Sequence, residues 1–158
     1  MAIQTNKPRN ASMRETKLKD HSRTILASYL ERHGYGAGEL QKIGSGFDLS
    51  HPVYEQKLDD RAMICQFVRN PSADRPLQKL GNWFCLRGAG MEGLAIFGGG
   101  EGRSIAVVRV EIGFIALEGT AAEVPRNWAN SIGGPGGLTQ IFVPDKYLMT
   151  NLRVLGYQ

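Results

Sequence analysis

The sequence has few of the residues that build metal sites or disulfide frameworks. Its 158 residues include two cysteines and three histidines, and none of them stand at the spacing of metal ligands. Both cysteines, Cys65 and Cys85, lie inside hydrophobic stretches ("AMICQFV" and "NWFCL"). This predicts buried, reduced thiols, with a disulfide between them as the alternative, and no bound metal.

Long hydrophobic runs are also missing. No apolar stretch approaches the roughly 20 residues that a membrane-spanning helix needs, and the start, "MAIQTNKPRNASMRETK", lacks the apolar centre of a signal peptide. Hydrophobic residues make up 42% and charged residues 22%, which is typical of a globular domain. The length predicts one domain, and we expect neither a membrane partner nor a targeting signal in the chain.

Most of the chain carries no excess of charge. Up to His33 there are seven Lys or Arg against three Asp or Glu, and beyond it twelve stand against twelve. A domain that binds nucleic acid usually spreads its basic groups over the body that faces the groove. The distribution therefore disfavours a nucleic-acid partner and leaves a basic N-terminal segment that can meet an acidic partner or a phosphate surface.

One long helix is predicted near the start. The residues "SMRE" from Ser12 fit a capping box, and apolar residues then recur at helical spacing as far as Leu30. Gly34 suits a left-handed cap at the end of this helix. Loop chemistry follows, with short turns expected at "GELQKI" and "PVYEQKL".

Short strands are predicted after Arg61. Fifteen of the 20 glycines follow Leu80, which argues against the long crossover helices of a doubly wound parallel sheet. The expected fold class is therefore α+β, an N-terminal helical region followed by a loop-rich, mainly antiparallel β core. The predicted strands are Ala62–Arg69, Asn82–Leu86, Arg103–Val110, "FIALEG", Thr139–Val143 and "LRVLGY", and "PDKYLMTN" is expected to form one helical turn capped by Asp145.

Two of these strands carry side chains suited to a ligand. Arg69 ends one strand, where its guanidinium can offer a fork of donors to a diphosphate or a carboxylate. Trp83 and Phe84 are neighbours, so on a strand one ring faces the core and the other faces outward, where it can stack on a flat heterocycle. The alternatives are a solvated surface arginine and plain core packing of both rings.

Other motifs favour plain loops and turns. "GGGEGR" and "GAGMEG" resemble phosphate-binding loops, but neither leads into a predicted helix. Asp48, Ser50 and His51 contain the residue types of a hydrolase triad, but as sequence neighbours they point in different directions, and a turn is expected instead.

Taken in order, "QFVRN", "GNWFC", Trp128, "GGPGGLTQ" and "LRVLGY" resemble the motifs of a group of bacterial NAD-consuming toxin domains. The group comprises the tuberculosis necrotizing toxin and related ADP-ribosyltransferase toxins of polymorphic systems. The resemblance covers Leu58 to Gln158 and leaves out the N-terminal helix. It implies a single catalytic domain, with residues 1–57 as a helical lead segment and 58–158 as an NAD-binding β core of ADP-ribosyltransferase type.

The resemblance also implies a site for NAD as substrate, without a metal. Gln140 would hydrogen-bond the ribose hydroxyls, Arg69 would hold the diphosphate or the adjoining ribose, and Arg87 is the spare arginine. Trp83 or Phe84 would flank the nicotinamide, and Asn82 would meet its carboxamide. The implied catalytic residues are Gln140 and Arg69, and the implied NAD-binding residues are Arg69, Asn82, Trp83, Phe84, Arg87, Trp128, Gly136 and Gly137.

Gln140 stands where many ADP-ribosyltransferases carry glutamate. An amide brings no negative charge to a cationic transition state, so a second carboxylate is expected to help, with Glu118 and Glu123 as candidates. In the necrotizing toxin group, glutamine at this position accompanies NAD hydrolysis. Some members carry a histidine on the strand that reads "IAVVRV" here, whereas this chain has none there, and Arg109 on that strand receives no role.

The function implied by the resemblance is cleavage of NAD and transfer of ADP-ribose to a target protein of the intoxicated cell. The toxin would be delivered by a secretion system or a larger carrier protein, and an immunity protein would block it. The charged N-terminal helix favours transfer, since it can recognise a macromolecule. NAD hydrolysis is the first alternative, a non-enzymatic β-rich interaction module is the second, and a nuclease toxin is the third.

Overall fold

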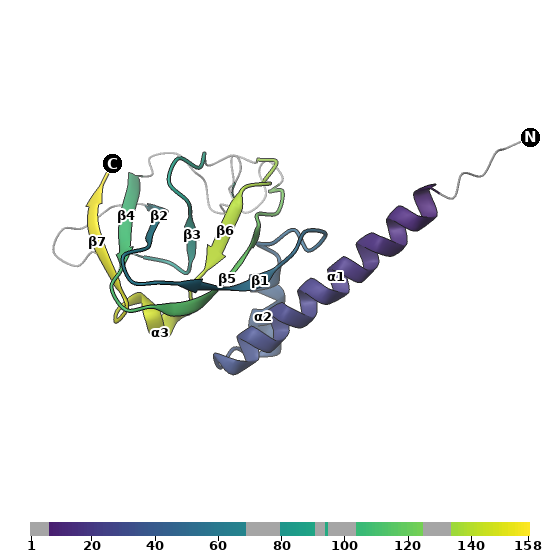
Figure 1. Ribbon diagram of the computed structural model, residues 1–158, viewed down its shortest axis with the longest axis horizontal. Coiled ribbons are helices and arrows are strands. Elements are labelled where there is room, and N and C mark those ends of the chain that lie inside the picture. The colour runs from purple at the N-terminus through teal and green to yellow at the C-terminus, as the bar shows by residue number, and fades with distance from the viewer. Residues whose placement is uncertain (1–6, 69–79, 91–93, 95–103, 125–133) are drawn as a thin grey trace, which may run out of the picture.

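The computed structural model describes residues 7–68, 80–90, 94, 104–124 and 134–158, without the side chains of residues 7–16 (Figure 1). Three helices and seven strands are assigned in this part of the chain. They are α1 (Lys7–Arg32), α2 (Ala37–Gly44), β1 (Tyr54–Leu58), β2 (Met63–Val68), β3 (Trp83–Cys85), β4 (Ser104–Val110), β5 (Phe114–Thr120), β6 (Thr139–Phe142), α3 (Asp145–Leu148) and β7 (Leu152–Tyr157).

The seven strands form one antiparallel sheet in the order β1-β5-β6-β3-β2-β4-β7. β2 and β3 share a single register pair, Cys65 opposite Cys85, whereas every other pair of neighbouring strands shares three or more. In Figure 1, β1 and β5 run across the view while β4 and β7 stand upright, so the sheet curves strongly between its ends. The expected α+β class with a mainly antiparallel core is confirmed.

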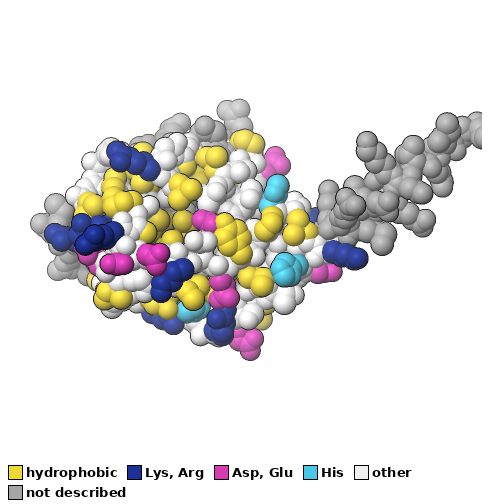
Figure 2. Space-filling view, viewed as in Figure 1, with side chains coloured by type: hydrophobic (Ala, Val, Ile, Leu, Met, Phe, Trp, Pro, Cys, Tyr) yellow, Lys and Arg dark blue, Asp and Glu magenta, His cyan; other side chains and the backbone are white. Residues whose placement is uncertain are grey.

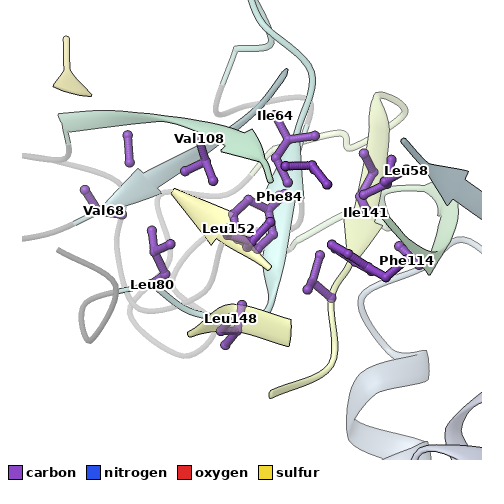
Figure 3. Close-up of a cluster of buried hydrophobic side chains, with 14 residues drawn as sticks. Leu58, Ile64, Val68, Leu80, Phe84, Val108, Phe114, Ile141, Leu148 and Leu152 are labelled. Atoms are coloured by element: carbon purple, nitrogen blue, oxygen red, sulfur yellow. The ribbon is translucent and has the colours of Figure 1, made fainter. Parts of the chain in front are cut away.

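Both faces of the sheet are covered by apolar side chains. The largest cluster lies within the curve and draws on strands from both ends of the sheet, including Leu58, Phe84, Val108 and Leu152 (Figure 3). Because side chains alternate along a strand, neighbours of these residues face the opposite side. There, the second cluster joins α1 and α2 to the sheet through Leu26, Tyr29, Leu30, Phe47, Val53, Leu117 and Phe142.

Helix α1 begins earlier than the sequence pattern indicates. It starts at Lys7, so Ser12 lies inside the helix and the expected capping box at Ser12 is wrong. The C-terminal end is as predicted: Gly34 has a φ of 82°, and Tyr35 N donates to Leu30 O at 3.0 Å, which closes a Schellman motif. Figure 1 shows the first part of the helix projecting from the body.

Strand β1 replaces the turn that was expected at "PVYEQKL". It is an edge strand that pairs with β5 alone, and only its last residue, Leu58, is buried. Such an edge has no regular alternation of buried and exposed residues, so the sequence pattern does not reveal it. The β core therefore begins inside the segment 1–57, ahead of the expected boundary at residue 58.

Of three smaller predictions about local features, one is partly wrong and two are confirmed. Helix α3 occupies the predicted turn, but its N-cap is Pro144, and the expected cap Asp145 is the first helical residue. Ser50 N donates to Asp48 Oδ1 at 3.0 Å, which confirms the expected turn there. Cys65 and Cys85 are buried and free, as predicted.

On the face seen in Figure 2, charges of the two signs are mixed. In Figure 2, acidic, basic and hydrophobic side chains are interspersed on the visible face. Among the described residues, no helix is long and apolar enough to cross a membrane. Likewise, the described part of the chain brings together no group of three or more His, Cys, Asp or Glu suited to a metal ion.

Candidate functional site

The structure joins the strand of the two aromatic residues to the strand of Gln140. β3 and β6 are antiparallel neighbours, with Trp83 opposite Phe142 and Cys85 opposite Gln140. On its other side Gln140 faces Gly119 of β5. β3 and β6, more than 50 residues apart in the sequence, thus meet at Gln140. Gln140 is only 2% exposed.

Apolar packing surrounds the start of β6. The Phe47 ring lies over Gly119, where an added Cβ would come within 2.7 Å of Phe47 Cδ1. Next to it, the Trp83 ring meets Phe47 and Phe142 edge-on at centroid distances of 5.0 and 5.2 Å. These rings belong to the cluster under α1 and α2. Among the described residues, these apolar rings therefore line the sheet next to the buried amide of Gln140, and burial strengthens the hydrogen bonds that an amide makes.

The two aromatic residues of β3 do point to opposite faces, but neither stands on an open face. Phe84 is 2% exposed inside the curved core, and Trp83 is half-buried against Phe47 and Phe142. The two rings thus lie on opposite faces as expected, but the outer face is covered by the second cluster, so Trp83 is half-buried there. Phe84 is packed as a core residue, and only Trp83 keeps accessible surface for a ligand.

Asn82 uses its amide within the chain. Its side-chain Nδ2 donates to Val143 O at 2.9 Å and to Asp145 Oδ1 at 2.6 Å. Its backbone carbonyl accepts from Val143 N at 2.7 Å. These bonds tie the start of β3 to the segment between β6 and α3. Both side-chain amide hydrogens of Asn82 are thus used within the chain, so a ligand carboxamide would meet its Oδ1 acceptor, and that role stays a prediction.

The glycine-rich run before β6 is held against the chain that follows β5. Gly137 N donates to Ala121 O at 3.0 Å, and Gly136 has a φ of 69°. A Cβ on Gly136 would lie 2.4 Å from Ala122 O, so this glycine is required by close backbone packing. At Gly137, with a φ of 95°, a Cβ would meet nothing within 4 Å, and an approach of ligand to the backbone stays a prediction there.

This contrast predicts unequal costs for two neighbouring substitutions. Gly136→Ala should lower the free energy of unfolding by about 2–4 kcal/mol, because it adds a backbone clash to an unfavourable φ. Gly137→Ala carries only the cost of the left-handed backbone, about 1–2 kcal/mol. Urea denaturation of the two variants checks the order, and equal costs would contradict the described packing of Gly136.

Glu118 does not face Gln140. It pairs with Ile141, one residue further along β6, so its side chain points to the opposite face of the sheet. There it lines a hollow of about 490 Å³ together with residues of the β1–β2 turn, and it accepts a hydrogen bond from the Tyr54 hydroxyl. Glu118 is therefore excluded as the second carboxylate beside Gln140.

The Tyr54–Glu118 contact has a measurable signature. The pKa of Tyr54 is raised from 10.0 to about 12, mainly by the hydrogen bond to the Glu118 carboxylate and secondly by burial of the hydroxyl. Stability from this contact is therefore fully present below pH 10 and is lost as the pH rises toward 12. In Glu118→Gln the pKa of Tyr54 should fall toward 10, measured by tyrosinate absorbance with Tyr54→Phe as the reference. An unchanged titration would contradict the contact.

Three of the remaining candidate residues belong to the described part of the chain and keep solvent exposure. Arg87 is exposed just after β3, and Glu123 is exposed between β5 and the glycine-rich run. Arg109 donates to Glu111 Oε1 at 2.9 Å on the surface. Arg69 and Trp128 lie outside the described residues, so their expected roles stay predictions.

One residue near the site was missed by the sequence reasoning. Gln66 of β2 is 7% exposed, and its side chain makes three hydrogen bonds to the backbone of the segment 81–83. It thereby positions the start of β3 beside β6. A single amide within an apolar strand, "ICQFV", was the available signal, and it is the same pattern that singled out Gln140.

Comparison with known proteins identifies the fold. Neither a protein-family model nor a curated protein sequence matches the chain. Among solved structures, Tse6 in complex with Tsi6 is similar with a TM-score of 0.71 and 19% identity, over 88% of this chain and 97% of that one. Rhs1-CT in complex with its cognate immunity protein RhsI1 is similar with a TM-score of 0.50 and 19% identity, over 84% and 92%.

Identities this low show a shared fold and nothing finer. The match to Tse6 covers more of the chain than residues 58–158 contain, so the shared fold includes part of the N-terminal segment. The fold shared with Tse6 therefore extends ahead of Leu58, whereas the bounds of the motif resemblance stay a prediction. In this chain α1 and α2 pack on the sheet and β1 is its edge strand, paired with β5.

Proposed function

We propose that this chain is a toxin domain that breaks the nicotinamide–ribose bond of NAD and transfers ADP-ribose to a target protein. The observation that carries the proposal is the position of Gln140, a buried amide at the meeting of β3, β5 and β6. It stands at the end of the glycine-rich motif on which the resemblance to ADP-ribosyltransferase toxins rests. The fold shared with Tse6 and Rhs1-CT supports this choice.

The proposed chemistry uses the amide for positioning. Loss of nicotinamide passes through an oxocarbenium-like transition state, as in glycoside cleavage. The carboxamide of Gln140 would donate and accept hydrogen bonds with the ribose hydroxyls and hold the ring for bond breaking. Of the two aromatic residues of β3, Trp83 keeps accessible surface and would contact the nicotinamide. Arg69 would hold the diphosphate.

Hydrolysis of NAD is the second candidate, and one observation favours it. Glu118 points away from Gln140, so among the described residues no carboxylate of β5 or β6 lies on the face of Gln140 to activate a protein acceptor. Water is abundant and reacts with an oxocarbenium-like centre without an acceptor docking site. The two outcomes share the first step and differ only in what receives ADP-ribose.

The proposed partners follow from the complexes in which the two similar structures were solved. Rhs1-CT is held by a cognate immunity protein, and Tse6 forms a complex with Tsi6. We extend this to the present chain and propose that an immunity protein binds it and that it acts in a target cell after delivery by a carrier or secretion system. A non-enzymatic interaction module is the competing function.

The test is incubation of the purified protein with NAD labelled in its adenylate half, with and without cell lysate. Transfer predicts labelled protein bands that depend on the toxin domain. Hydrolysis predicts free ADP-ribose and nicotinamide without a labelled band. NAD that persists in both conditions would overturn the enzymatic proposal and leave the interaction module.

A further inference from the structure

The two cysteines of the chain face each other where two neighbouring strands share the fewest register pairs of the described sheet. Cys65 on β2 and Cys85 on β3 form the single register pair between these strands. Both residues are 4% exposed, and both thiols are free. They belong to one small apolar cluster that also contains Leu94.

The geometry of this pair suits a covalent bond. Residues directly opposite in an antiparallel pair have Cα atoms about 4.5–5.5 Å apart, within the range that disulfides span. Their side chains lie on the same face, and Cys85 Sγ already reaches within 3.4 Å of Cys65 O. Because the described residues of β2 and β3 share only this register pair, an adjustment that brings the two sulfurs together affects one point of the ladder and the nearby Gln66 bonds to the segment 81–83.

We propose that Cys65 and Cys85 form a reversible intramolecular disulfide when the chain folds under oxidising conditions, and that this bond fastens β2 to β3. The two cysteines are 20 residues apart, so the bond closes a loop of moderate length and restricts the unfolded chain. It would join the part of the sheet that carries β4 and β7 to the part that carries β5 and β6.

The reaction is an exchange with a small-molecule disulfide such as oxidised glutathione. One cysteine thiolate attacks the glutathione disulfide and releases one glutathione thiol, and the second cysteine then displaces the other glutathione. Two protein S–H bonds are lost and one S–S bond forms, while the glutathione disulfide is reduced to two thiols. The oxidant supplies the electron acceptor, and no metal is needed.

Burial decides when the exchange takes place. Loss of solvation raises the pKa of Cys85 to about 12 and also raises the pKa of Cys65, so neither thiol ionises readily in the folded protein. The covered pair should resist oxidants once the reduced chain has folded. Oxidation is therefore expected during folding, while the thiols are still exposed.

The test is refolding of reduced, denatured protein in glutathione buffers of graded redox poise, followed by alkylation and mass measurement of the intact chain. We expect a monomer lighter by two hydrogen atoms that takes up no alkylating agent, and recovery of both thiols on reduction. The oxidised protein should melt roughly 5–10 °C above the reduced one. The single variants Cys65→Ala and Cys85→Ala should show neither effect.

Two results would overturn the proposal. The first is a refolded protein that carries only mixed glutathione disulfides or interchain dimers across the whole range of redox poise. The second is an intramolecular disulfide that lowers the melting temperature, since the bond would then distort the junction. Neither readout involves NAD, so this inference and the proposed function are tested separately.

Discussion

Replacing Gln140 by alanine should reduce the rate of NAD loss at least about 100-fold while the domain stays folded. The amide is the polar group at the point where β3, β5 and β6 meet, and alanine removes every hydrogen bond it can offer to a ribose. Gln140→Glu keeps the shape and one acceptor oxygen and replaces the NH2 donor by a second acceptor, so it should retain more activity than the alanine variant. The measurement is the initial rate of NAD consumption, with urea denaturation alongside.

The matched control for this experiment is Thr139→Ala. Thr139 precedes Gln140 on the same strand, and its side chain faces the other side of the sheet. Its rate should stay within a few-fold of the unaltered protein. A folded Gln140→Ala protein that consumes NAD at the full rate would remove the basis of the proposed site.

Replacing Gln66 by alanine should produce the largest loss of stability among the polar residues discussed. Its Nε2 donates to Gly81 O at 2.9 Å and to Trp83 O at 2.7 Å, and its Oε1 accepts from Gly81 N at 2.9 Å. Alanine leaves these three backbone groups without the side chain that satisfies them. We expect the free energy of unfolding to fall by about 3–5 kcal/mol in urea or thermal denaturation.

Gln56→Ala is the control for Gln66→Ala. Gln56 lies on the edge strand β1, is half-buried, and among the described residues its side chain makes one long hydrogen bond of 3.3 Å, to Lys57 O. Its replacement should change stability by no more than about 0.5 kcal/mol. If Gln66→Ala were equally mild, the described role of Gln66 in holding the start of β3 would be wrong.

Local patterns predicted the elements that have two buried sides or a distinct end. The strands at Met63–Val68 and Ser104–Val110 are apolar enough to be recognised, and Gly34 ends α1 in the left-handed conformation that glycine permits. The edge strand Tyr54–Leu58 was missed because its residues are mostly exposed. The start of α1 was misplaced because the pattern at Ser12 also fits the interior of a helix.

In the candidate site, too, local sequence predicted single positions, whereas their neighbours depend on strand pairing. The position of Gln140 at the start of a strand was predicted, but its neighbours Cys85 and Gly119 were not, since they depend on which strands pair. The alternation along β5 separates Glu118 from Gln140, a relation that requires the register of β5 against β6. The bonds of Asn82 to Val143 and Asp145 likewise depend on contacts between distant segments.

The sequence by itself determined the class of fold, the burial of both cysteines, and the glycine-rich run that leads into the strand of Gln140. These features follow from composition and from interactions among residues a few positions apart. Only the tertiary structure decided that β3 lies between β2 and β6, that Phe84 is a core residue, and that Gly136 packs on the backbone of Ala122. Pairing and register result from the burial of all the strands together, which no short segment specifies alone.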